Sequence, residues 1–202
     1  MSRIWWYVLA DDNGMAPCID QGILTLSCCK PMIGRYAKEG EWVIAFVPKG
    51  LTQGPVAWVG RIAEILSLGD YQTRFSNRND AIYKRIRYES DGRESLEPLR
   101  DDYHAKPRNR SSDIRGKKAL IFEPFWYWGG HGISASEEIT NLAYYHIGQT
   151  TKYSSPEKIT QLKAWARSEA NPVVHGKPRD ELRTRAQKHC RSPDDADLPY
   201  RR

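Results

Sequence analysis

Four consecutive aromatic residues followed by a glycine pair, FWYWGG at positions 125–130, have the chemistry to hold a flat ligand. Successive side chains of a strand point to opposite faces, so two rings would enter the core and two would stay available. We expect Trp126 and Trp128 to line a nucleobase pocket, because indole rings replace the stacking that an extruded base loses. Gly129 would let the backbone come close to the base. The alternative is that all four rings are core and the glycines only turn the chain.

Polar residues elsewhere in the sequence could complete this pocket. Asp12 and Asn13 precede Gly14 at the end of the first predicted strand, where they could hydrogen-bond the Watson–Crick edge of a base. The same letters also form an ordinary turn, since Asn-Gly is a strong turn dipeptide. Lys30, before a predicted helix, could contact a phosphate. The predicted pocket residues are Asp12, Asn13, Cys28, Lys30, Tyr83, Trp126, Trp128, Gly129, His131 and His175.

The cysteines suggest neither a zinc site nor disulfides. The four residues lack C-x-x-C spacing, and they are Cys18, Cys28, Cys29 and Cys190. We expect reduced thiols, with one of the neighbouring Cys28 and Cys29 packed inward and the other facing a loop. Catalysis by either thiol would need a base, and the candidates are His131, His146 and His175. We expect a double Cys28→Ser, Cys29→Ser variant to keep ligand binding.

The positive charge is concentrated in two segments. The net charge is +6, and residues 74–118 and 151–202 each carry +5 while the rest of the chain carries −4. This distribution is expected where a polyanion is gripped from outside a compact domain; the alternative is solvated basic loops. His175 could equally be a packed or capping histidine. The predicted phosphate-binding residues are Arg108, Arg110, Lys177, Arg179, Arg183 and Arg185.

Short strands separated by turn residues predict an α+β fold, a small mixed barrel of about five to six strands with peripheral short helices. A C-terminal helix over 156–169, capped by Ser155, would dock on the barrel. Residues 89–116 are predicted as a long polar, basic insertion. The predicted strands lie within 4–10, 41–48, 55–66, 80–89 and 117–128. The other helices are predicted to begin near Pro31, near Ser67, and near Ser134 or Ser136, the first ending with Gly40 as its C-cap.

The domain is predicted to span residues 1–182, and residues 183–202 to form a basic, poorly ordered tail. No hydrophobic run approaches the roughly 18 to 20 residues that a bilayer requires, and residues 4–10 are too short and too aromatic for a signal peptide. We therefore expect a cytosolic protein that does not bind membranes.

Two segments resemble the opening of PUA-like domains of the EVE and ASCH kind. The stretch KEGEWVIAF at 38–46 matches a turn in which those domains usually carry Gly-Asp, with Glu41 here in place of the aspartate, and AWVGRIAEIL follows at 57–66. The resemblance implies a PUA-like barrel. Such barrels bind RNA or DNA, and several extrude a modified base into an aromatic pocket.

A closer resemblance is to the nucleotide-modification-associated domain family, type 2, found in bacteria and phages near DNA-modification and defence genes. Its pattern is matched in order by residues 12–46, RNDAIY at 78–83, the block at 122–133 and VVHGKPRD at 173–180. Cys18 and the longer basic segment before residue 117 depart from that pattern. The family implies a role in handling modified nucleotides, with possible protein partners in a modification or defence system.

Three functions are consistent with these features. No nucleotide-binding glycine loop, metal cluster or triad is visible in the sequence, so we expect no metal or cofactor and favour a module that binds a modified base, in DNA more than in RNA, or a modified nucleotide. The alternatives are an enzyme that adds, removes or processes a base modification, and a structural adaptor in a defence complex, with the aromatic block as its interface.

Overall fold

A seven-stranded sheet forms the body of the protein in a computed structural model that describes residues 2–49, 52–101, 103–104, 107–142 and 149–178. The strand order is β2-β3-β8-β5-β4-β1-β9. β1 runs parallel to β4, and the other neighbours are antiparallel. The strands are β1 Ser2–Val8, β2 Cys18–Asp20, β3 Ile23–Leu26, β4 Trp42–Lys49, β5 Thr52–Ser67, β8 Lys118–Tyr127 and β9 Gln149–Ser154.

The α+β class is confirmed, but a closed barrel is not found. β2 and β9 end the strand order on opposite sides and do not pair with each other, so the sheet formed by the described strands stays open. β5 curves across the sheet, with register shifts between Gly60 and Ile62 and between Ile62 and Glu64. Such shifts bend a strand, which gives the sheet curvature without closure.

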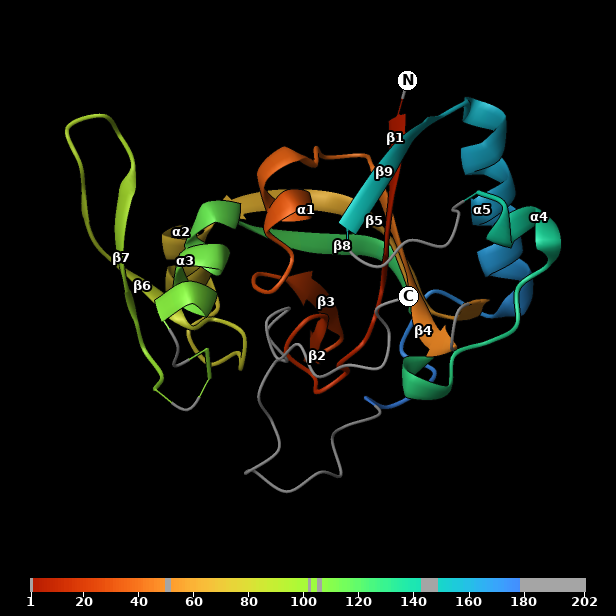
Figure 1. Cartoon of the computed structure of the whole chain (residues 1–202), viewed down its shortest axis with the longest axis horizontal. Coiled ribbons are helices and arrows are strands. Elements are labelled where there is room, and N and C mark those ends of the chain that lie inside the picture. Colours follow the sequence, from red (N-terminus) through yellow and green to blue (C-terminus); the bar gives the residue numbers. More distant parts are fainter. Residues whose placement is uncertain (1, 50–51, 102, 105–106, 143–148, 179–202) are drawn as a thin grey trace.

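Both faces of the sheet are buried, and alternate residues of each central strand enter different cores. Trp5 and Tyr7 of β1 pack in the first core, whereas Ile4 and Trp6 pack in the second. The second core is covered by α5 (Pro156–Glu169) and α4 (Glu137–Thr140), which lie together on one side of the molecule (Figure 1). A sheet covered on both faces needs apolar residues at successive positions, which explains the continuous apolar runs of the central strands.

The predicted helices are confirmed, with one boundary corrected. Ser67, Ser136 and Ser155 accept hydrogen bonds from backbone N–H groups at the starts of α2 (Leu68–Arg74), α4 and α5. α1 (Pro31–Tyr36) ends earlier than predicted, because its C-cap is Ala37 and not Gly40. Gly40 instead occupies a turn with φ of +83°, a conformation that suits glycine.

The segment predicted as a polar insertion contains two regular elements. β7 (Glu94–Pro98) pairs with β6 (Tyr83–Tyr88) in a two-stranded ribbon that projects from the end of the molecule opposite to α5 (Figure 1). α3 (Pro107–Gly116) follows. Nothing in the sequence indicated these two elements, because cross-strand and helical hydrogen bonds satisfy this polar backbone without an apolar pattern. β2, β3 and β9 were also not predicted, and each is short or polar.

Three further expectations concern the C-terminal tail, the cysteines and membrane-spanning helices. The predicted tail, residues 183–202, and Cys190 lie outside them. Cys18, Cys28 and Cys29 are free thiols, and Cys28 is buried whereas Cys29 is partly exposed. Within the described part of the chain, no helix has the length and apolar character needed to span a membrane.

Candidate active site

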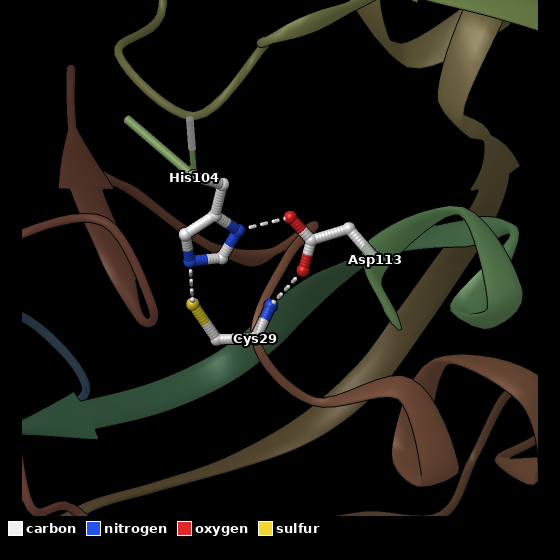
Figure 2. A group of neighbouring side chains, drawn as sticks. All are labelled: Cys29, His104 and Asp113. Atoms are coloured by element: carbon white, nitrogen blue, oxygen red, sulfur yellow. Dashed lines mark hydrogen bonds and ion pairs between the residues drawn. The ribbon is translucent and has the colours of Figure 1, made fainter. Parts of the chain in front are cut away.

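Cys29, His104 and Asp113 meet at one point although up to 84 positions separate them in the sequence. Cys29 lies in the loop between β3 and α1, His104 precedes α3, and Asp113 belongs to α3. The thiol Sγ is 3.2 Å from His104 Nε2, and His104 Nδ1 is hydrogen-bonded to Asp113 Oδ2 (Figure 2). The three side chains therefore form a continuous thiol, imidazole and carboxylate chain.

Asp113 is held in place by three donors. Its carboxylate is buried and accepts from the backbone N–H of Cys29 at 2.7 Å, from the Tyr83 hydroxyl at 2.8 Å and from the His104 ring. Burial raises the pKa of Tyr83 well above its usual value, and the negative charge of Asp113 raises it further. The Tyr83 hydroxyl thus keeps its proton at neutral pH, so it remains a donor that orients the carboxylate.

The backbone is unusual at both ends of the thiol–imidazole contact. Cys29 has φ of +63° and His104 has φ of +51°, in the left-handed region that residues with a Cβ seldom adopt. Each such conformation costs on the order of 1 to 3 kcal/mol and persists only where neighbouring contacts impose it. The bond from the Cys29 N–H to Asp113 is one such contact. Strained backbone of this kind is common at functional sites.

Tyr103 and Arg110 fix the histidine. The Tyr103 ring stacks on the imidazole with centroids 4.2 Å apart and planes 14° from parallel, and its hydroxyl lies 3.1 Å from Cys29 Sγ. Arg110 Nε donates to the His104 carbonyl at 3.2 Å, and its Nη2 bonds to Asp101. Arg110 was predicted to bind phosphate, but its guanidinium bonds to the His104 carbonyl and to Asp101 of this loop.

A buried polar network secures the β2–β3 hairpin from which the Cys29 loop emerges. The Arg78 guanidinium donates to the carbonyls of Asp20 and Cys18 and to Thr25 Oγ1. The Asp80 carboxylate accepts from the hydroxyls of Thr25, Ser27 and Tyr71. Because the side chains of this network are buried, the network fixes the position of β3 more tightly than apolar packing of so short a strand would.

The first turn of α1, directly after Cys29, is capped from β9. The side-chain oxygen of Gln149 accepts from the backbone N–H groups of Met32 and Ile33 at 3.0 and 3.1 Å. These N–H groups have no partner within the helix, so the cap satisfies them. The loop that carries Cys29 is therefore held at its beginning by β3 and at its end by α1.

The three side chains could hold a metal ion, since their donor atoms all lie within 4.8 Å of one another. The observed contacts suit proton transfer better, because the thiol and the carboxylate approach opposite nitrogens of the imidazole. One ion cannot replace both contacts without turning the ring away from Asp113. A carboxylate on Nδ1 holds the ring so that Nε2 faces the thiol, which is the arrangement of a nucleophilic triad.

The aromatic block lies in the core. Trp126 and Tyr127 are fully buried, and Phe125 and Trp128 are 9% and 8% exposed. Trp126 and Trp128 pack in the second core, where the Trp126 indole donates to the Ala170 carbonyl at 2.9 Å. This is the alternative that the sequence left open. Its physical reason is that α5 covers the face on which we expected the tryptophans to stay accessible.

The glycine pair approaches the protein's own chain. Gly129 has φ of +77°, and a Cβ there would lie 2.2 Å from the Lys177 carbonyl oxygen. Gly130 N–H donates to that same oxygen at 3.2 Å, and the His175 N–H donates to the Tyr127 carbonyl at 2.7 Å. The close backbone approach expected for a base is thus used by residues 173–178.

Two of the other predicted pocket residues, Asp12 and His175, contact the aromatic block, at the Tyr127 hydroxyl and the Trp128 ring. Asp12 is buried and accepts from the Tyr127 hydroxyl at 3.0 Å, while Asn13 Oδ1 accepts from the Met15 N–H at 3.2 Å, as in a turn. His131 is exposed in the short helix η1 (Gly129–His131), and His175 Nε2 contacts the Asn171 carbonyl at 2.6 Å. Cys28, Lys30 and Tyr83, in contrast, lie beside the thiol site.

The predicted phosphate-binding residues are dispersed. Arg108 is exposed on α3 and Lys177 is exposed after α5. His146, named as a possible base, lies outside the described residues, as do Arg179, Arg183 and Arg185.

Sequence reasoning missed His104 and Asp113, the two residues that complete the hydrogen-bonded chain with Cys29. No local motif links positions 29, 104 and 113, and His104 and Asp113 lie in polar segments without apolar periodicity. The segment from 89 to 116 did stand out as a departure from the family pattern. A search for histidines with a nearby acid in that segment would have found this pair.

Comparison with known families places the chain. No curated protein and no solved structure matches it. A family model described as nucleotide modification associated domain 2 matches residues 1–185. The chain therefore belongs to the family of nucleotide modification associated domain 2, and the family's name ties its role to nucleotide modification.

Proposed function

We propose that this protein is an enzyme that processes a modified nucleotide or a modified base, with Cys29 as its nucleophile. The observation that carries the proposal is the hydrogen-bonded chain from Cys29 Sγ through the His104 ring to the Asp113 carboxylate. The family match supplies the nucleotide context. Cys29 is partly exposed while His104 and Asp113 are buried, so the proposed nucleophile is the member of the triad closest to solvent.

The geometry assigns a role to each member of the triad. His104 Nε2 accepts the proton of the Cys29 thiol, and the resulting thiolate attacks an electrophilic carbon. Asp113 keeps Nδ1 protonated and stabilises the imidazolium that forms. The Tyr103 hydroxyl, 3.1 Å from Sγ, donates a second hydrogen bond to the thiolate. Nε2 then holds a proton at the position where a leaving group departs.

Thiol labelling tests this proposal without knowledge of the substrate. At about pH 6, where an ordinary thiol reacts slowly, Cys29 should react with iodoacetamide at least about tenfold faster in the wild type than in a His104→Ala variant. Peptide mass spectrometry identifies the labelled residue. Cys28→Ser is the matched control, because Cys28 adjoins Cys29 but is buried and bonds to the Met15 carbonyl. Equal rates in wild type and His104→Ala would contradict the proposal, and so would zinc that copurifies with the wild type and is lost on substitution of Cys29.

Binding without chemistry is the second candidate function, and the exposed Arg108 and Lys177 with the net charge of +6 favour it. In this case the protein recognises a modified base, in DNA rather than in RNA, or a free modified nucleotide. Alternatively, it joins a modification or defence complex as an adaptor. A panel of unmodified and modified DNAs, RNAs and free nucleotides separates the two. Product formation that Cys29→Ala abolishes supports the enzyme. Selective binding without turnover, unchanged by Cys29→Ala, supports the binding module.

A further inference from the structure

A narrow crevice beside Cys29 is lined by two lysines. Cys28, Cys29, Lys30, Asp113 and Lys118 all contribute to its walls, and both lysines are half-buried. Lys30 is the residue next to the nucleophile, and Lys118 begins β8 two residues after α3 ends. The wall of the crevice therefore combines two lysine residues with Cys29.

The described part of the chain contains no carboxylate in an ion pair with either lysine. The Lys30 ammonium lies 4.6 Å from the centroid of the Tyr7 ring in a cation–π contact. Asp113 is the acid in the crevice wall, and its oxygens are engaged by the Cys29 N–H, Tyr83 and His104. A crevice with this charge balance attracts an anion.

Tyr7 lies close both to Lys30 and to the thiols of Cys28 and Cys29. Burial raises the pKa of the Tyr7 hydroxyl well above its usual value, and the nearby Asp12, Cys29 and Cys28 raise it further. The Trp58 indole donates to this hydroxyl at 3.0 Å and fixes the ring. The Tyr7 ring is thus a rigid support for the Lys30 ammonium next to the sulfur.

The triad itself indicates the kind of reaction. His104 Nε2 faces Sγ while Nδ1 is held by Asp113, so the proton taken from the thiol is returned close to the atom that the sulfur attacks. This suits a substitution whose leaving group departs from that same atom, as in acyl transfer. Addition to a ring carbon would instead require an acid at a more distant atom of the base.

We propose that Cys29 removes an acyl group from an anionic nucleotide derivative, with Lys30 and Lys118 binding the anionic group beside the attacked carbonyl. The inference rests on the proposed function and adds the substrate class. The anion is a phosphate of the nucleotide or a carboxylate on the acyl chain, since a lysine ammonium pairs with either.

The reaction balances without an oxidant or reductant. The thiolate attacks the carbonyl carbon, the bond from that carbon to the exocyclic amine breaks, and His104 Nε2 gives its proton to the departing amine. A thioester then links the acyl group to Cys29. Water attacks this carbonyl while Nε2 accepts its proton, the carbon–sulfur bond breaks, and the acid and the free thiol are released.

A pair of alkylating agents tests the anion preference. Iodoacetate carries a negative charge and iodoacetamide does not, so the ratio of their rates at Cys29 reports the charge of the crevice. We expect this ratio to fall about tenfold in a Lys30→Met, Lys118→Met double variant and to be retained in Lys30→Arg. Lys84→Met is the matched control, since Lys84 is an exposed lysine of β6. An unchanged ratio in the double variant would overturn the role of the lysines.

Three acylated nucleosides test the chemistry and distinguish the two anions. N4-acetyldeoxycytidine is neutral, its 5′-monophosphate supplies a phosphate, and N4-succinyldeoxycytidine supplies a carboxylate. Intact mass and product release should show Cys29 acylation that is at least about tenfold faster with one of the charged compounds, and this advantage should be lost in the double lysine variant. Absence of acylation, or equal rates for all three compounds, would overturn the inference. Rapid iodoacetamide labelling that depends on His104 would in that case leave the proposed function standing.

Discussion

The aromatic block at 125–128 and the Cys29 site differ in how they use side chains. The block places four large rings in adjacent positions, and the structure buries all of them. The Cys29 site joins three modest side chains from separate segments, and Cys29 itself is partly exposed. Large apolar side chains near one another in the sequence report first on the core, whereas a reactive group is defined by its partners in space.

The two regions are connected through the central sheet. Phe125 and Tyr127 pack in the first core, as does Tyr7, whose ring supports Lys30. Trp126 and Trp128 pack beneath α5 in the second core. The block thus stiffens the strand between the two cores, and the loops at one end of the sheet carry the polar groups. The four predictions below test this division, from the largest expected effect to the smallest.

Trp126→Ala should destabilise the protein without altering the thiol site. The ring is fully buried and its indole N–H bonds to the Ala170 carbonyl, so we expect a loss of about 3 to 5 kcal/mol in the free energy of unfolding. Denaturant unfolding measures this loss. The iodoacetamide rate of Cys29 should be unchanged at temperatures where the variant is folded. Tyr36→Ala, at a side chain that is 44% exposed, is the control and should change stability by about 0.5 kcal/mol or less. A stable Trp126→Ala variant with altered ligand selectivity would restore the block as a binding site.

The fold was more predictable from the sequence than the site was. Runs of bulky and β-branched residues predicted β1, β4, β5 and β8, and capping serines predicted the starts of α2, α4 and α5, because these features are local. The burial of both faces of β8 was not local information, since it depends on where α5 docks. The docking position of α5 decides whether Trp126 lies in the core or lines a pocket.

The site was unpredictable for a different reason. The left-handed backbone of Cys29 and the stacking of Tyr103 on His104 arise only when β3, α1 and α3 assemble. α3 lacks an apolar stripe, and Asp113 is among its buried residues. An element held by polar contacts gives no periodic signal, so neither α3 nor the role of its aspartate could be recognised beforehand.

Asp113→Asn should affect the thiol site much more than the core. An asparagine keeps the size of the side chain but can no longer stabilise the His104 imidazolium, so we expect the Cys29 labelling rate at about pH 6 to fall about 100-fold, or about 2.7 kcal/mol. Asp101→Asn is the control, because Asp101 is a carboxylate near the same loop that contacts Arg110 at the surface. Equal labelling rates in wild type and Asp113→Asn would show that the carboxylate does not support the histidine.

Alkaline pH should weaken the folded state through the tyrosine that orients Asp113. The pKa of Tyr83 is raised in the folded protein, so above about pH 10 the unfolded chain releases a proton that the folded chain retains. The stabilising contribution is therefore complete below about pH 10 and is lost as the pH rises further. Each such tyrosine lowers the free energy of unfolding by about 1.4 kcal/mol per pH unit.

Tyr83→Phe should remove one such contribution from the slope. The raised pKa values of Tyr7 and Tyr71 leave the remaining pH dependence in place. Denaturant unfolding at several pH values between about 9 and 11 measures the slope for wild type and variant. Tyr88→Phe is the control, since this ring is 57% exposed. If Tyr83→Phe and wild type share the same slope, Tyr83 is not the buried donor that the site requires.

The smallest effect should separate two arginines of the same helix. Arg110 Nε donates to the His104 carbonyl, so Arg110→Ala should loosen the histidine and slow Cys29 labelling about threefold, or about 0.7 kcal/mol, within the range expected for one hydrogen bond. Arg108 is exposed two residues earlier, and Arg108→Ala should leave labelling unchanged. If Arg108 contacts a nucleic-acid phosphate, the same variant should weaken binding to modified and unmodified DNA alike, and should reduce the salt dependence of binding by about one unit of slope. Stopped-flow labelling and salt titration are applied to both variants. In this case Arg110→Ala changes the labelling rate, whereas Arg108→Ala changes DNA binding. Identical patterns would mean that one face of α3 serves both the thiol site and the polyanion.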